Sequence, residues 1–208
     1  MTGGEYYRAV VAEVRGRGHF FKATQPDGFS FMGWPKKQYV VGETTEAKGS
    51  GNVLCKTGLL HVSDVPSETL AGGKWPARLC EVRGEIIAGF SEEHPHKGGA
   101  KRLFVVRELP SWMALGPNGR MVIAFIEALR TLDVPAPDAA RYAARYAAPD
   151  AAPDAARDAA PDAACALVVA DLIRPEHLAT LYAPFEEALP LEELRKRAIA
   201  MFPMEATK

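Results

Sequence analysis

The chain has 208 residues, a formal net charge of −1 at pH 7 and a hydrophobic content of 48%. This length suits one ordinary domain with extensions, and the near-zero charge excludes binding of nucleic acid or anionic membranes through an overall basic field. Three cysteines exclude a disulfide framework and are typical of a reducing compartment, so we expect a cytoplasmic protein. The N-terminus is too polar for a secretory leader, and no apolar run is long enough for a membrane span.

The first half of the chain is predicted to be rich in β-strands. Its short segments of β-branched and aromatic residues are separated by glycine, proline and polar turns. A short helical turn is expected from Pro66 or Ser67 to Leu70, with Ser63 or Asp64 as its cap. Residues 91–100 are expected to form a polar loop. The expected strands are residues 6–14, 19–24, 29–33, 38–41, 53–55, 58–62, 77–82, 85–88 and 101–109.

The spacing of the apolar residues changes after Pro110. Asn118 is placed to cap a helix over residues 119–132, whose apolar side chains fall on one helical stripe. Further helices are predicted at residues 164–173, 175–182 and 191–202.

A tetrapeptide repeat separates these helices. Residues 136–163 form seven consecutive units of the pattern A-[PR]-[DY]-A. Pro149, Pro153 and Pro161 would each cost roughly 3 kcal/mol inside a regular helix, so short turns are expected instead. Because alanine has no reactive group, we expect any specific chemistry to lie outside the repeat.

Together these patterns predict an α+β protein with a mostly antiparallel, β-rich N-terminal domain and a helical C-terminal region. The predicted parts are a β-rich domain at 1–110, a helix packing on it at 111–135, the repeat at 136–163 and a helical tail at 164–208. Few helices fall between the strands, which disfavours a doubly wound parallel sheet.

The common signatures of nucleotide-binding loops, serine hydrolases and zinc proteases do not occur in the sequence. Cys55, His61, His94 and His96 are candidate metal ligands, but their spacing is irregular and no second cysteine pair accompanies them, so no metal is expected. A nucleophilic pair of Cys55 or Cys80 with His61 lacks a sequence signal for an activated thiol.

Aromatic and basic residues alternate in the segment 34–39, with the sequence WPKKQY. Stacking together with two lysines is one way to hold a nucleic-acid strand. The favoured interpretation is the edge of a β-hairpin, where lysines prevent pairing with other chains and aromatic residues pack beneath.

Four segments of the first domain resemble known families. They are FFKAT at 20–24, LHVSD at 60–64, ARLCEVRG at 77–84 and KRLFVVREL at 101–109. Residues 19–110 resemble an uncharacterised domain of actinobacterial and phage proteins that often carries an Ala-rich repeat tail. At longer range, the segments are similar to the small rifampin ADP-ribosyltransferases. That resemblance implies a split β-sheet whose cleft binds NAD and transfers ADP-ribose.

The resemblance also implies a site. Lys22 stands where those enzymes have a histidine that holds the ribose of NAD, and Ser63 stands where they have a tyrosine that stacks on nicotinamide. Thr24 and His61 would complete the NAD contacts. The catalytic carboxylate would come from Glu93, its neighbour Glu92, or Glu108, because an oxocarbenium-like centre needs a negative charge beside it. The predicted catalytic set is Lys22, Ser63, Glu93 and Glu108.

Two other functions compete with an enzyme that uses NAD as its substrate. One is a non-catalytic accessory module of a phage or an actinobacterium that binds a protein partner, with Ala-rich helices that self-associate. The other is a nucleic-acid module centred on residues 34–39.

Overall fold

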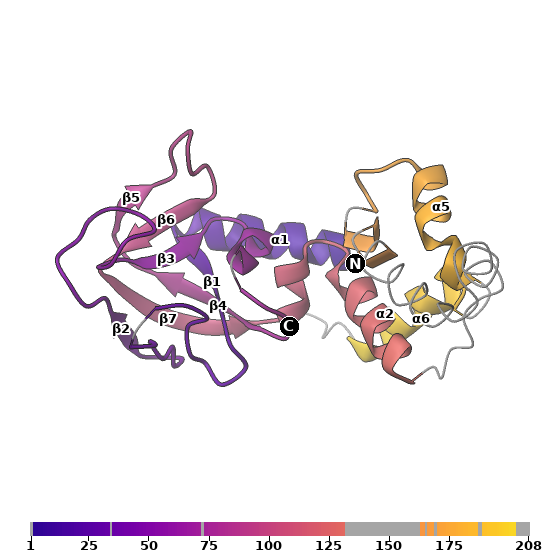
Figure 1. Ribbon diagram of the computed structural model, residues 1–208, viewed down its shortest axis with the longest axis horizontal. Helices are drawn as coiled ribbons and strands as arrows, with labels where there is room; N and C mark the ends of the chain where they lie inside the picture. Colours follow the sequence, from indigo (N-terminus) through magenta and orange to yellow (C-terminus); the bar gives the residue numbers. More distant parts are fainter. Residues whose placement is uncertain are drawn as a thin grey trace, which may run out of the picture. The chain divides into compact units, whose positions relative to one another are not determined.

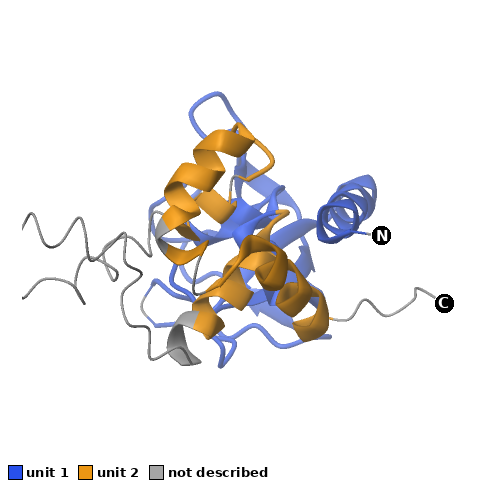
Figure 2. Ribbon diagram, turned by 90° about the vertical axis from the view of Figure 1, so that its right-hand side faces the viewer, with its two compact units in different colours: residues 1–116 blue, residues 117–208 orange. Residues whose placement is uncertain are grey.

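The computed structural model describes residues 2–33, 35–71, 73–131, 163–164, 166–168, 170–186 and 189–202. The chain divides into two compact units, Met1–Gly116 and Pro117–Lys208 (Figure 2). Unit 1 contains an antiparallel sheet, and helices follow later in the chain, so the predicted α+β class is confirmed. The tetrapeptide repeat lies outside the described residues except for Ala163.

The described part of unit 1 is built on a seven-stranded sheet in the order β2-β7-β4-β1-β3-β6-β5, with every neighbouring pair antiparallel (Figure 1). The predicted strands at 19–24, 58–62, 77–82, 85–88 and 101–109 are confirmed, with bounds shifted by a few residues. The strands are β1 Phe20–Thr24, β2 Thr44–Glu46, β3 Leu60–Ser63, β4 Arg78–Arg83, β5 Ile86–Gly89, β6 Lys97–Ala100 and β7 Arg102–Leu109.

The sheet is weakly joined between β1 and β3. Strand β1 pairs with β4 over five residue pairs, from Phe20 opposite Val82 to Thr24 opposite Arg78. Toward β3, its described pairing consists of Phe21 opposite Ser63. The two strands therefore separate along most of their length, and both line the cavity described below.

The prediction of a strand at residues 6–14 is wrong, because this segment lies in helix α1, Gly3–Gly16. A capping box begins the helix: the Thr2 hydroxyl accepts a hydrogen bond from the Glu5 amide, and the Glu5 carboxylate accepts one from the Thr2 amide. Tyr7, Val10 and Val14 are buried at helical spacing. Packing of this face outweighs the β-propensity of the valines and tyrosines.

The expected loop at 91–100 is also partly wrong, since its end forms strand β6. Two glycines let this strand approach its neighbours closely. A Cβ atom at Gly98 would lie 2.5 Å from the Phe90 ring, and one at Gly99 would lie 2.8 Å from the Leu59 side chain. The composition therefore reflects tight packing rather than a flexible loop.

Three of the short expected strands are absent from the described chain. Residues 29–33 and 38–41 share an isolated bridge between Phe29 and Gln38, and 53–55 form a turn. The turn at 66–70 is confirmed as the 3-10 helix η1, Pro66–Leu70. Its N-cap is Val65, which has no side-chain cap bond, so the predicted capping by Ser63 or Asp64 is wrong. A second 3-10 helix, η2, covers Ser111–Leu115.

The two faces of the sheet differ in chemistry. One carries the apolar cluster of Tyr39, Leu60, Val62, Cys80, Val82, Ala100, Leu103 and Val105. On the other, the fully buried Glu81 accepts hydrogen bonds from His19 and Arg107, both at 2.6 Å. Burial alone would raise the pKa of Glu81, but these bonds and charges hold it below its usual value. Arg107 also pairs with Glu13 of α1 at 3.0 Å, which links that helix to β7.

Unit 2 is helical in its described part. The helices are α2 Gly119–Thr131, α5 Pro175–Glu186 and α6 Leu191–Met201. Rings of Phe125, Tyr182 and Phe185 pack with centroids 5.0–6.2 Å apart. The guanidinium of Arg120 donates to the carbonyl oxygens of Ile199 and Phe202 at the end of α6. None of the described helices is long and apolar enough to cross a bilayer.

Candidate functional site

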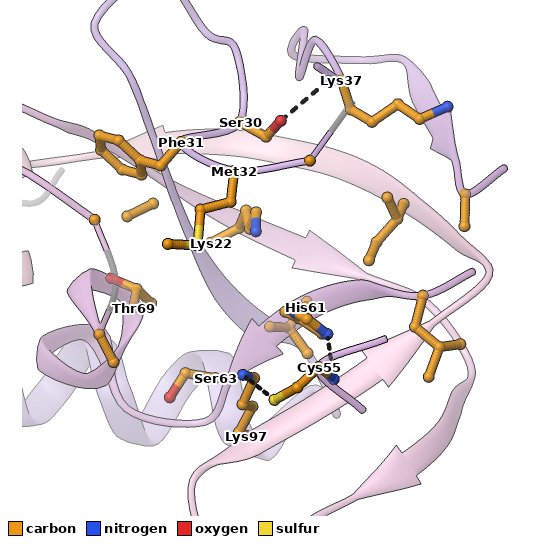
Figure 3. A pocket seen from close by; sticks show the side chains of 18 of the residues that line it. Lys22, Ser30, Phe31, Met32, Lys37, Cys55, His61, Ser63, Thr69 and Lys97 are labelled. Atoms are coloured by element: carbon orange, nitrogen blue, oxygen red, sulfur yellow. Dashed lines mark hydrogen bonds between the residues drawn. The ribbon is translucent and has the colours of Figure 1, made fainter. Parts of the chain in front are cut away.

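A cavity of about 760 Å³ lies in unit 1, where β1 and β3 meet the loops that carry residues 30–39, 47–58 and 93–96 (Figure 3). Lys22 comes from β1, His61 and Ser63 from β3, and Lys97 from the start of β6. This volume lies within the range of sites that bind small molecules.

Lys22 is the most unusual side chain of the cavity. It is half-buried, and its Nζ atom lies 5.4 Å from the centroid of the Tyr39 ring. In the described part of the chain, no carboxylate forms an ion pair with it. Burial, with a further contribution from the charge of Lys97, lowers the pKa of Lys22 to about 8. The cavity thus holds a cation that has an aromatic neighbour and, among the described residues, no ion-paired carboxylate.

A second cluster joins Cys55, His61 and Lys97 (Figure 3). The Cys55 amide donates to His61 Nε2 at 3.2 Å, and Lys97 Nζ donates to Cys55 Sγ at 3.0 Å. Because Nε2 accepts, the neutral imidazole carries its proton on Nδ1. Burial, followed by the charges of Lys97, Lys22 and His94, lowers the pKa of His61 to about 4. His61 is therefore uncharged at neutral pH.

Positive charge predominates along the described lining of the cavity. The lysines are Lys22, Lys37, Lys48, Lys56 and Lys97, whereas the carboxylates are Glu68 and Glu93. A concave surface of this kind concentrates the positive field and favours an anionic ligand.

One wall of the cavity is anchored by a lysine outside the lining. Lys101 Nζ donates to the carbonyl oxygens of Gly49, Gly51 and Gly58, at 3.3, 2.6 and 2.9 Å. The loop that carries residues 93–96 is held through Asp64, whose carboxylate accepts from His96 Nδ1 at 2.9 Å and pairs with Arg15 at 3.1 Å. Both loops are therefore held in place by charged side chains.

The structure brings together four of the residues that sequence reasoning assigned to a site: Lys22, His61, Ser63 and Glu93 all line the cavity. Ser63 is buried, and its hydroxyl accepts a hydrogen bond from the Val65 amide at 3.0 Å.

Thr24 and Glu108 are not among the lining residues. The buried Thr24 hydroxyl donates to the Gln25 carbonyl at 3.0 Å. Glu108 accepts from Arg78 Nε at 2.9 Å on the surface of β7. Of the two predicted catalytic carboxylates, the cavity therefore contains Glu93.

The metal and nucleophile hypotheses involve the same cavity. Cys55, His61, His94 and His96 all line it, yet no three His, Cys, Asp or Glu side chains of the described residues are arranged to hold a metal ion. Cys80 is buried in β4, and burial raises the pKa of its thiol to about 11. A thiol of that kind is a poor nucleophile at neutral pH.

In the described part of segment 34–39, the aromatic residue Tyr39 is not exposed for base stacking. Tyr39 is buried, with 1% of its surface exposed, and Lys37 lines the cavity. This placement agrees with the packed-hairpin interpretation for Tyr39; Trp34 lies outside the described residues.

Sequence reasoning missed Lys97 and Glu68 as lining residues and Lys101 as an anchor. Lys97 lay in the segment interpreted as a loop. The available signal for β6 was that Lys97 and two glycines precede the alternating pattern of residues 101–109.

Comparisons with protein-family models, with curated proteins and with solved structures found no match to this chain.

Proposed function

We propose that unit 1 is a nucleotide-binding domain of the ADP-ribosyltransferase-like kind, with NAD as its ligand and substrate. The observation that carries the proposal is Lys22, a half-buried ammonium that pairs with no carboxylate of the described residues and lies in a cavity where lysines predominate. The diphosphate of NAD would supply the missing negative charge. The kinship with actinobacterial and phage accessory proteins rests on the sequence resemblance and is part of the same proposal.

The lining suits a ligand that is part anion and part aromatic. Lys22 and Lys97 supply two ammonium groups, and the neutral His61 supplies an Nδ1–H donor. Phe31, Met32 and Tyr39 supply apolar surface for a base or a nicotinamide ring. Lysine binds phosphate as a point charge. Lys22 would therefore bind the phosphate next to the ribose and would not stack against the ribose ring.

The chemistry would be cleavage of the bond between nicotinamide and ribose. Positive charge develops on the ribose as neutral nicotinamide leaves, and a nearby carboxylate stabilises this charge. An acceptor nucleophile or water then adds to the same carbon and releases its proton. Glu93 is the carboxylate that we assign to this role, because it lines the cavity and Glu108 does not.

Titration calorimetry with NAD tests the binding, and release of nicotinamide tests the reaction. We expect Lys22→Met to weaken NAD binding by about ten-fold, the effect of losing one charged hydrogen bond to phosphate. Glu93→Gln should retain binding and lose nicotinamide release. Glu108→Gln is the matched control, because it removes a carboxylate outside the cavity, and it should change neither measurement.

The outcomes separate the candidate functions. Binding without nicotinamide release would show a degenerate, non-catalytic nucleotide module. Absence of heat with both NAD and ADP-ribose would refute the proposal and favour the accessory-module alternative. The Ala-rich part of that alternative lies outside the described residues and stays a prediction.

A further inference from the structure

The surroundings of Lys22 suit a reactive amine as well as an anchoring cation. The side chain leaves β1 opposite Cys80 of β4, on the face of the apolar cluster that includes Tyr39 and Val62. Its Nζ atom lies 5.4 Å from the centroid of the Tyr39 ring and, among the described residues, forms no hydrogen bond with an oxygen or nitrogen acceptor. A lysine that is withdrawn from water and lies near a second cation has the environment of an imine-forming lysine.

The surroundings of Lys22 raise the fraction of its neutral form above that of an ordinary lysine. The groups that act on it are Lys97, which opposes its charge, and Cys80, whose thiol would support it only as a thiolate. Burial raises the pKa of Cys80 to about 11, so that thiol is protonated at neutral pH. With the pKa of Lys22 near 8, about a tenth of its amine is unprotonated at pH 7, against well under a thousandth for an ordinary lysine.

We propose that Lys22 is a nucleophile that forms an imine with a small anion carrying an aldehyde or ketone group. Lys97 lines the same cavity and would bind the anionic end of that ligand. The ligand class follows from the pairing, in one cavity, of an amine able to react with a second lysine that can bind an anion.

The neutral Nζ atom adds to the carbonyl carbon, one of its protons passes to the carbonyl oxygen, and a neutral carbinolamine forms. Uptake of one proton from solvent and loss of water then leave a protonated imine; no oxidant or reductant is consumed. Hydride from cyanoborohydride then converts the imine to a stable secondary amine, which records the site of reaction.

This inference does not rest on NAD. If Lys22 is a nucleophile, it forms the imine even in a chain that does not bind NAD. If Lys22 only supplies a charge, the chain binds NAD but forms no imine. The two tests therefore fail independently.

The experiment treats the full chain with glyceraldehyde 3-phosphate and sodium cyanoborohydride at pH 7 and follows each lysine by peptide mass spectrometry. We expect Lys22 to be labelled at least about ten times faster than Lys36, an exposed lysine outside the cavity lining. Uncharged glyceraldehyde should show a smaller preference for Lys22, and inorganic phosphate should compete with the phosphorylated probe.

Three variants complete the test. Lys22→Arg keeps a cation and should abolish labelling at this position, with folding checked by circular dichroism. Lys97→Met should slow labelling of Lys22 by glyceraldehyde 3-phosphate more than by glyceraldehyde. Lys36→Met should leave Lys22 labelling unchanged. Equal labelling of Lys22 and Lys36, or a Lys22 rate indifferent to the phosphate group, would overturn the proposal.

Discussion

Replacement of Lys22 by methionine is expected to stabilise unit 1. A pKa difference of one unit corresponds to about 1.4 kcal/mol. A fall from the ordinary value of 10.5 to about 8 therefore means that the fold disfavours the charged side chain by about 3 kcal/mol. Methionine keeps an unbranched apolar stem but loses the contact of the ammonium with the Tyr39 ring, worth about 1 kcal/mol. The expected net gain in the free energy of unfolding is about 2 kcal/mol.

The sign of the effect sets its pH dependence. The folded state holds the Lys22 pKa below that of the unfolded chain, so the charged lysine destabilises the fold most below pH 8. The penalty disappears as the pH rises toward 10.5, where the unfolded lysine also loses its proton. Urea unfolding of wild type and Lys22→Met at pH 7 and pH 10 measures the difference, which should shrink at the higher pH. A variant less stable than wild type at pH 7 would refute the reasoning.

Three further perturbations address other parts of the chain. Glu81→Gln should lower the free energy of unfolding by about 3 kcal/mol in urea, because it leaves His19 and Arg107 without their buried carboxylate, whereas Glu46→Gln in the exposed pair with Arg102 should cost less than about 1 kcal/mol. Since the pKa of Glu81 is lowered in the fold, Glu81 stabilises the folded state above the usual carboxyl pKa, and this stabilisation is lost as the pH falls through the lower folded value. An equal loss of stability in the Glu81 and Glu46 variants would contradict this account. Lys101→Met should speed amide hydrogen exchange in residues 49–58, because three carbonyl oxygens lose their donor, and unchanged exchange there would show that Lys101 is not the anchor. Tyr182→Phe should destabilise unit 2 by about 1 kcal/mol in thermal unfolding, because the buried hydroxyl donates to the Leu189 carbonyl at 2.7 Å, and a neutral result would show that the carbonyl finds another donor.

Strands with clear side-chain patterns were predictable from the sequence. The apolar residues of 102–109 and 78–83 and their flanking turns are sufficient to place β7 and β4. Helix α1 was not recognised, because its valines and tyrosines favour strands locally and its three buried residues reveal a helical period only when they are counted. The Thr2-to-Glu5 capping box was the missed signal.

The candidate site was predictable only in part. The strand assignments placed Lys22, His61 and Ser63 on β1 and β3, and the structure brings these strands to one cavity. Glu93 lines the cavity, whereas Glu108 lies outside it and pairs with Arg78 of the neighbouring strand β4. Such a pairing depends on strand register, which the sequence does not display.

The way in which Lys101 holds the wall of the cavity has an evolutionary consequence. The three hydrogen bonds of its ammonium go to main-chain oxygens, so the segment that it secures can exchange most of its side chains, its glycines excepted, and keep its backbone path. Lys56 on that segment and Lys48 beside it are thus free to diversify under selection for new ligands, whereas Cys55 is held by its hydrogen bond from Lys97. The scaffold and the selectivity of the pocket can accordingly evolve at different rates.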